Sequence, residues 1–498
     1  MTYDVIIGIE THIQLNTRTK MFCRCSTDSW QAAPNTHVCP VCLGLPGALP
    51  VLNKAGLDKA LLVGLALHAQ VQERAKFDRK NYFYPDLAKG YQISQFDQPL
   101  HLGGYVEVLG EKIGLTRAHL EEDVGKLTHE GDKSLVDFNK AGTPLLEIVS
   151  EPVIHSAASA KAYVQTLRQL MRYIGVNEGN LEKGTMRADV NISLQEPGKW
   201  HYASGAFTVE PGYAMNNRVE VKNLNSFRHI ERAIIYEIER QTHQLGKGDT
   251  IAQETRGWDD PSGKTTLQRS KEEAHDYRYF PEPDLPPLQI SPDWIASVLL
   301  QLPELPADKL HRFMEQYGLS DYDAQVITEE RPLAEWFEEA VRCAIQVAQN
   351  QGTEVASKTI AKTVLNWMMG ELAKLQNDRQ IPLWEANILP AHLAEVMWLV
   401  DEGRLSTASA KEVLGVVFET GIDPQQYVVK MGLTQLSATA DLEPIVDWVI
   451  ASNTDAVAKY LAGKESSMMF LVGQVMKETQ GRAKPDVVKN LLTERLKI

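Results

Sequence analysis

The chain has 498 residues, which is too long for a single hydrophobic core and suggests about two to four domains. A hydrophobic fraction of 43% and a charged fraction of 23% are ordinary for a globular protein, and no uninterrupted apolar run approaches the roughly 18 residues that a membrane-spanning helix needs. A net charge of −14 argues against a protein that coats nucleic acid indiscriminately.

The first 22 residues have the pattern of a strand followed by a turn. Glu10 and His12 stand two positions apart, so on a strand their side chains share one face. The N-terminus has no basic leader and no Arg-rich transit segment, which predicts a cytoplasmic protein.

Four of the five cysteines form two closely spaced pairs. Short spacings of this kind in a cytoplasmic chain indicate a structural zinc site more than disulfides, and four reduced cysteines without metal are the alternative. Cys343 stands alone in a helical pattern and is expected in a core. The predicted zinc ligands are Cys23, Cys25, Cys39 and Cys42.

A helical pattern over residues 53–70 precedes a segment of mixed charges and aromatic rings at residues 77–97. That segment has neither helical nor strand period, and loops of such composition often line sites. Arg79, Lys80 and Lys89 could face phosphates while the tyrosines stack on a base or ribose; a packed aromatic loop is the plainer interpretation.

Residues 117–151 contain two strand-like stretches that carry acids among apolar residues. Glu122 shares a strand face with Leu120 and Val124, and Glu147 lies between Leu146 and Ile148. Unpaired carboxylates in such surroundings are costly, so we expect them to hold a cation, magnesium, and through it ATP.

Further strands are predicted at residues 105–108, 187–194 and 218–221, and helices at 157–174 and 227–245. Strands and helices alternate without a regular rhythm, which favours an α+β fold with a largely antiparallel sheet. Asp189 on the second of these strands joins the candidate set. Oxygen ligands with one imidazole suit magnesium or manganese, although each acid alone could be an ordinary exposed strand residue. The candidate catalytic residues are Glu10, His12, Glu122, Glu147 and Asp189.

A second candidate group is basic and could bind triphosphate oxygens opposite the metal. Alternation places Arg218, Glu220 and Lys222 on one strand face, and a solvated, salt-bridged strand explains that pattern equally well. The group comprises Arg187, Arg218, Lys222, Arg269 and Lys271.

Residues 257–265 imitate a phosphate-binding loop, but they have one residue too many between the glycines and no preceding apolar strand. We therefore reject a P-loop. No serine-amidase signature is present either, so any ammonia required must come from another chain.

A proline-rich hinge at residues 281–287 ends the mixed part of the chain, and helical patterns follow from residue 293. We predict domains at residues 1–290, 291–400 and 401–498. Residues 455–498 carry eight Lys or Arg and five Asp or Glu, a net of +3 that reverses the charge of the whole.

Several long runs resemble the B subunits of the tRNA-dependent amidotransferases. They lie at residues 7–15, 39–53, 77–97, 119–126, 145–152, 218–227, 269–285 and 470–477 and span nearly the whole chain. One departure is the connection at residues 202–217, which is longer than is usual in this family.

The resemblance implies a kinase-like cradle related to glutamine synthetase, then a helical domain and a tail that contacts tRNA. It implies ATP-dependent phosphorylation of the side-chain carboxylate of Glu-tRNA(Gln) or Asp-tRNA(Asn), followed by amidation with ammonia from an A subunit that is an amidase, with a small C subunit completing a heterotrimer. It also implies that His12, Glu122 and Glu147 are magnesium ligands, with Glu10 and Asp189 serving a second ion or a polar ammonia path.

Two competing interpretations stay open at this point. One is a non-catalytic scaffold that positions tRNA and the amidase, and the other is a ligase for free amino acids. The cost of a buried acidic cluster without cations argues against the first. The helical C-terminal half with its basic end argues against the second.

Overall fold

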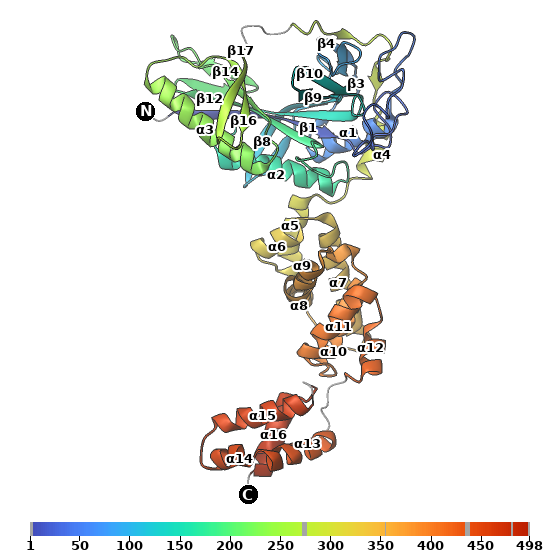
Figure 1. Cartoon of the computed structure of the whole chain (residues 1–498), viewed down its shortest axis with the longest axis vertical. Helices are drawn as coiled ribbons and strands as arrows, with labels where there is room; N and C mark the ends of the chain where they lie inside the picture. The colour runs from blue at the N-terminus through green and yellow to red at the C-terminus, as the bar shows by residue number, and fades with distance from the viewer. Residues whose placement is uncertain (1–2, 271–275, 354, 434–438, 480–481, 497–498) are drawn as a thin grey trace. The chain divides into compact units, whose positions relative to one another are not determined.

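The computed structural model describes residues 3–270, 276–353, 355–433, 439–479 and 482–496 (Figure 1). The chain divides into two compact units, Met1–Ala307 and Asp308–Ile498. Lys271, one of the predicted phosphate ligands, lies outside the described residues.

The first unit is built on a ten-stranded sheet with the order β17-β16-β15-β12-β1-β11-β8-β6-β2, in which β7 also pairs with β8. β15 and β16 run parallel, and the other pairs in this sheet are antiparallel, which confirms the predicted largely antiparallel sheet. The strands are β1 (Asp4–Gln14), β2 (Gln70–Val71), β6 (His101–Leu102), β7 (Tyr105–Val108), β8 (Glu111–Glu122), β11 (Pro144–Ser150), β12 (Met186–Gln195), β15 (Val219–Lys222), β16 (Glu254–Asp259) and β17 (Lys264–Ser270).

Other strands of the first unit form smaller sheets. β18 (Phe280–Pro281), β4 (Asp78–Asn81) and β5 (Tyr91–Ser94) form a three-stranded sheet. Three further pairs join β3 (Arg74–Ala75) to β19 (Leu288–Gln289), β9 (Lys126–Glu130) to β10 (Lys133–Asp137), and β13 (Trp200–Ala203) to β14 (Ala206–Val209). The β13–β14 hairpin occupies much of the connection that was longer than expected. Residues 257–265, the rejected P-loop, belong to the antiparallel pair of β16 and β17.

Helices cover one face of the large sheet, and Figure 1 shows α2 (Ala157–Tyr173) and α3 (Phe227–Gly246) side by side along it. Ser156 and Ser226 cap these helices by accepting backbone N–H bonds, and Asn53 does the same for α1 (Lys54–Ala66). α4 (Pro292–Leu299) packs on α1. Apolar residues of the sheet and helices form one continuous core, which includes Ile7, Ile9, Leu146, Ile148, Val190, Leu167 and Ile234.

The opposite face of the same strands carries the polar residues. Side chains alternate along a strand, so the positions between the core residues of β1, β11 and β12 point away from the helices. Glu10 pairs across the sheet with Asp189, and His12 pairs with Glu147. Directly opposed residues of antiparallel strands share a face, so the fold brings these four side chains to one surface.

The second unit is helical. It contains α5 (Pro306–Tyr317), α6 (Asp321–Ile327), α7 (Arg331–Asn350), α8 (Ser357–Trp367), the π-helical turn η1 (Met368–Leu372), α9 (Ala373–Arg379), the short η2 (Leu383–Glu385), α10 (Pro390–Asp401), α11 (Thr407–Thr420), α12 (Pro424–Met431), α13 (Thr439–Ser452), α14 (Thr454–Leu461), α15 (Ser466–Glu478) and α16 (Pro485–Leu496). None of the helices in the described ranges is long and apolar enough to cross a membrane.

Two hydrophobic cores organise these helices. One draws on residues between Phe313 and Val428, and the other on residues between Leu442 and Leu496. The predicted division at residue 400 cuts through the first of these cores, because Leu393 before it and Val413 after it pack in the same cluster. The cores place that division after Val428 and before Leu442.

Candidate functional site

Three side chains converge on the face of the large sheet that lies opposite the helices. His12 Nε2 lies 3.3 Å from a Glu147 oxygen and 3.6 Å from a Glu121 oxygen. One potential ligand atom from each of the three residues lies within 4.8 Å of the others. β1, β11 and β8 are neighbouring strands, so their register alone assembles this metal-type cluster.

The side chains of Glu121 and Glu147 are buried, and the protonation state of each residue in the cluster depends on the charges of the others. Burial and the nearby charge of Glu147 raise the pKa of Glu121 to about 7. Burial favours the neutral form of His12, but the hydrogen bond and charge of Glu147 raise its pKa to about 9. Burial would raise the pKa of Glu147 as well, yet the neighbouring His119 and His12 hold it below its usual range. His12 and Glu121 therefore hold protons more tightly than usual, and a cation that binds to them would displace these protons.

Glu122 is not part of this cluster, contrary to the prediction. Glu121 pairs with Leu145 across β8 and β11 and so shares the face of Glu147, whereas Glu122 pairs with Pro144 and has the opposite orientation. Glu122 instead forms an ion pair of 2.5 Å with Lys89 and accepts a hydrogen bond of 3.0 Å from the Ile93 amide. The carboxylate that joins His12 and Glu147 is Glu121.

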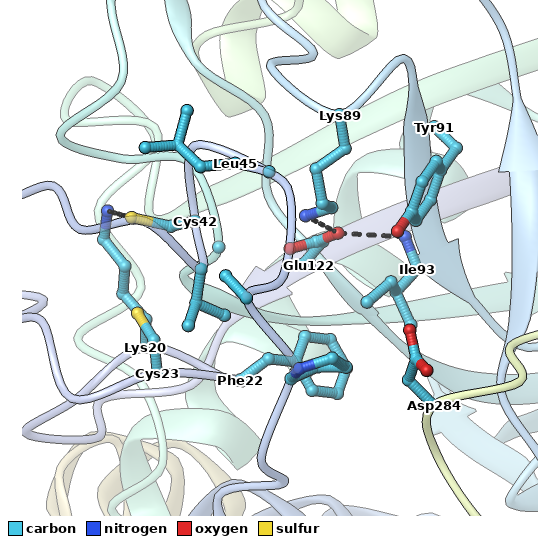
Figure 2. A pocket seen from close by; sticks show the side chains of 15 residues that line it. Lys20, Phe22, Cys23, Cys42, Leu45, Lys89, Tyr91, Ile93, Glu122 and Asp284 are labelled. Atoms are coloured by element: carbon cyan, nitrogen blue, oxygen red, sulfur yellow. Dashed lines mark hydrogen bonds and ion pairs between the residues drawn. The ribbon is translucent and has the colours of Figure 1, made fainter.

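Figure 2 shows where Glu122 lies, on the wall of a cavity of about 90 Å³. The Lys89 ammonium and the Ile93 amide both contact the same oxygen of its carboxylate. Lys20 and Cys42 line the same cavity, which therefore lies between the end of β8 and the loop that carries Cys23, Cys25, Cys39 and Cys42, here called the cysteine loop.

The remaining acids continue the polar face along β1, β12 and β15. Asn191 donates a hydrogen bond of 3.0 Å to Glu10, and burial and the charge of Glu147 raise the pKa of Glu10. Lys222 lies 3.1 Å from Asp189 and 3.2 Å from Glu220. Glu10 and Asp189 thus continue the acidic side chains of this face from the cluster to Lys222.

Four of the cations predicted to meet phosphate form ion pairs with carboxylates in the structure, and Lys222, paired with Asp189 and Glu220, is one of them. Arg79 forms a bidentate pair with Glu282, with both N–O distances at 2.7 Å. Arg187 lies 2.9 Å from Asp123, and Lys89 is the partner of Glu122. Their positions are explained by these pairs without a phosphate.

Lys80 is different. In the part of the chain that the structure describes, its ammonium has no hydrogen bond or ion pair, and it lies 5.1 Å from the centre of the Tyr277 ring. Burial favours the neutral amine, but Glu121, Tyr279 and Glu147 together raise the pKa of Lys80. Its charge is therefore available to a ligand beside the acidic cluster.

The other two basic candidates have less distinctive surroundings. Arg218 is exposed immediately before β15, and Arg269 is exposed near the end of the edge strand β17. Among the described residues, no hydrogen bond or ion pair joins either arginine to His12, Glu121 or Glu147.

The four clustered cysteines form a second candidate metal centre. Their sulfur atoms all lie within 4.8 Å of one another, and the sulfurs of Cys39 and Cys42 are 3.8 Å apart. A tetrahedral zinc ion with bonds of about 2.3 Å separates its sulfur ligands by about 3.8 Å, so this arrangement fits zinc. The Cys23 thiol and the Cys39 backbone lower the pKa of Cys42 to about 4, whereas the hydrogen bond with Cys42 raises the pKa of Cys23 and burial raises that of Cys25 to about 11. Cys42 is thus a thiolate, and a metal ion would have to displace protons from its neighbours.

The sheet-face cluster also fits the chemistry of a divalent ion. Two carboxylates and one imidazole are suitable ligands for magnesium or manganese, and a six-coordinate ion held by three protein groups keeps positions for water and phosphate oxygens. The three ligands come from three strands of one sheet, which holds them rigidly in place.

Sequence reasoning missed Glu121 and His119, although a usable signal was present. These two residues stand two positions apart, as Glu10 and His12 do, and His119 Nε2 lies 3.8 Å from Glu121 and 3.6 Å from Glu147. That spacing applied to β8 would have selected Glu121 over Glu122.

Comparison with known proteins agrees with this architecture. Residues 5–296 match the family described as the GatB/GatE catalytic domain, and residues 352–496 match the family described as the GatB domain. Proteins named as the B subunit of aspartyl/glutamyl-tRNA(Asn/Gln) amidotransferase are similar over their full length. The protein from Persephonella marina is 46% identical, with 100% of both chains covered. The protein from Moorella thermoacetica is 47% identical, with 100% of both covered, and that from Thermotoga maritima is 44% identical, with 100% of this chain and 99% of the relative covered. This chain therefore belongs to the family of amidotransferase B subunits.

Proposed function

We propose that this chain activates the side-chain carboxylate of Glu-tRNA(Gln), Asp-tRNA(Asn) or both with ATP, and that it completes amidation with ammonia. The observation that carries the proposal is the convergence of His12, Glu121 and Glu147 on the face of the sheet opposite the helices. A carboxylate accepts ammonia poorly until one of its oxygens becomes a phosphate leaving group, so phosphorylation must precede amidation.

The residues would divide this work as follows. His12, Glu121 and Glu147 would hold magnesium, which when bound neutralises charge on phosphoryl and carboxylate oxygens. Lys80 would place a positive charge beside the transferring phosphoryl group. Glu10 and Asp189 would keep the adjoining surface polar for ammonia or bind a second ion.

The partners follow from the same proposal. An A subunit with amidase activity would release ammonia from glutamine, a small C subunit would complete the heterotrimer, and the C-terminal helices would contact tRNA. The first unit would be a cradle of the glutamine synthetase type, and the four cysteines would hold a structural zinc ion.

The direct test is an assay of the enzyme assembled with its partner subunits. Charged tRNA, ATP and glutamine should give amidated aminoacyl-tRNA with release of ADP and phosphate, and ammonium chloride should replace glutamine. His12→Ala should abolish product formation, while His201→Ala on the exposed β13–β14 hairpin should leave it unchanged. Full activity of His12→Ala would favour a scaffolding role, and amidation without ATP cleavage would overturn the phosphorylation step.

A further inference from the structure

Four aromatic rings form a continuous row beside the three-stranded sheet of β18, β4 and β5. Phe96 stacks on Tyr279, with ring centres 4.2 Å apart and planes inclined by 6°. Tyr279 meets Tyr277 at 6.0 Å, and Tyr277 meets Tyr82 at 5.8 Å, both edge to face. We refer to Phe96, Tyr279, Tyr277 and Tyr82 as the aromatic row.

The backbone holds this row in place at a conformational cost. The Asn81 backbone amide donates a hydrogen bond to the Tyr277 carbonyl, and the Asn81 side chain donates bonds to the carbonyls of Tyr277 and Arg278. Arg278, between the two tyrosines, has a φ of +45°, a left-handed conformation that non-glycine residues rarely adopt. Such strain persists where surrounding contacts enforce it, and it is concentrated at functional sites.

The row adjoins the acidic cluster. Ser94 on β5 donates a hydrogen bond of 3.3 Å to Glu121, and Phe96 follows two residues later. Lys80 on β4 pairs with Gln92 and points its ammonium toward the ring of Tyr277. A ligand lying on the row would therefore reach Lys80 and the metal-type cluster at the same time.

Rings next to an unpaired cation form a surface suited to nucleic acid bases and phosphates. The row reaches solvent at one end, since Phe96 is 56% exposed, and Tyr279, Tyr277 and Tyr82 are partly exposed. A pocket for a mononucleotide usually encloses most of its ligand, whereas an open row accommodates successive bases. Amidation also requires the amino acid, esterified to the terminal ribose of tRNA, to reach the cluster.

We propose that the aromatic row stacks the unpaired bases at the 3′ end of the charged tRNA and thereby delivers its aminoacyl group to His12, Glu121 and Glu147. This inference rests on the proposed function and names the residues that receive the substrate's single-stranded end. Lys80 contacts a phosphate of that strand or of ATP as the two substrates meet.

The test uses the assembled enzyme and the double variant Phe96→Ala/Tyr279→Ala. Its affinity is measured for full-length tRNA(Gln) and for the same tRNA lacking its unpaired 3′ nucleotides, and KM is measured for ATP and for Glu-tRNA(Gln). We expect a loss of about tenfold or more in affinity for full-length tRNA, no change for the truncated tRNA, and an unchanged KM for ATP. Tyr279→Phe keeps the ring and should bind full-length tRNA normally, and Phe207→Ala on the exposed hairpin is the matched aromatic control.

Three outcomes would overturn the inference. They are an equal loss of affinity for both tRNAs, a raised KM for ATP with tRNA binding intact, and no change at all. The proposed function itself is tested on the parent enzyme. If the parent shows no ATP-dependent amidation, that function is refuted, whatever the variants do. A normal melting temperature for the double variant shows that it is folded.

Discussion

Glu121 and Glu122 are adjacent in sequence and have opposite surroundings. Glu121 faces His12 and Glu147, whereas Glu122 faces Lys89 and the Ile93 amide. The sequence contains the acids but not the register of β8 against β11, and a shift of one residue exchanges the two faces. The kind of site was therefore predictable from residue types, while one of its members was not.

At the residue scale, the protonation of the cluster gives a pH prediction. A metal ion requires ionised Glu121 and neutral His12, whose pKa values without metal are raised to about 7 and about 9. Both groups must lose protons on binding, so the apparent affinity for Mn²⁺ should rise as pH increases from about 6 to 9. Calorimetry in buffers of different ionisation enthalpy should show proton release. An affinity that stays constant or falls over this range would contradict the assignment.

At the element scale, the strands and helices of the first unit were largely predictable. Periodicity located β7, β12, β15, α2 and α3, because their apolar residues face one continuous core. The function of the residues 77–97 segment was harder to assign. Two of its cations, Arg79 and Lys89, pair with carboxylates from distant positions, Glu282 and Glu122, and pairings of that kind are set by tertiary structure.

Because Arg79 pairs with Glu282, we expect a substitution of Arg79 to lower the stability of the protein and to leave nucleotide binding unchanged. It joins β4 to the turn after β18 through a bidentate contact with a buried carboxylate. Arg79→Lys loses one of the two hydrogen bonds and should destabilise the protein by about 1–3 kcal/mol, with a lower melting temperature and an unchanged KM for ATP. Arg278→Lys, in an exposed turn, is the control. A raised KM for ATP at normal stability would instead place Arg79 on the nucleotide.

The four clustered cysteines predict that the stability of the protein depends on a bound metal ion. The purified protein should contain about one zinc ion per chain, and chelation or Cys42→Ser should remove it and lower the melting temperature, because the ion links residues on both sides of the loop. Cys343→Ser in α7 should retain the zinc. Metal analysis that finds no zinc in the parent protein, with no effect of chelator, would disprove the site.

At the scale of the whole molecule, the separate cores determine which truncations are informative. A cut at residue 401 removes α11, whose Val413 and Val417 pack in the core of the preceding helices. A cut before α13 removes only the last core, from Leu442 to Leu496. Composition located the change to helical structure but could not show which helices share a core.

Deleting residues 439–498 should therefore leave a folded enzyme with a selective defect. If the basic C-terminal segment contacts tRNA, KM for the charged tRNA should rise by about tenfold or more while KM for ATP stays unchanged. The defect should be partly masked at low salt, where the remaining phosphate contacts are stronger. Unchanged KM values for both substrates would separate this segment from tRNA binding.

The most direct test of the central claim compares Mn²⁺ binding by Glu121→Gln and Glu122→Gln, measured by electron paramagnetic resonance on the assembled enzyme with ATP present. The account predicts that Glu121→Gln weakens Mn²⁺ binding by about a hundredfold or more and abolishes phosphorylation, while Glu122→Gln binds Mn²⁺ like the parent. Normal Mn²⁺ binding by Glu121→Gln, or loss of binding in Glu122→Gln alone, would contradict a metal centre at His12, Glu121 and Glu147.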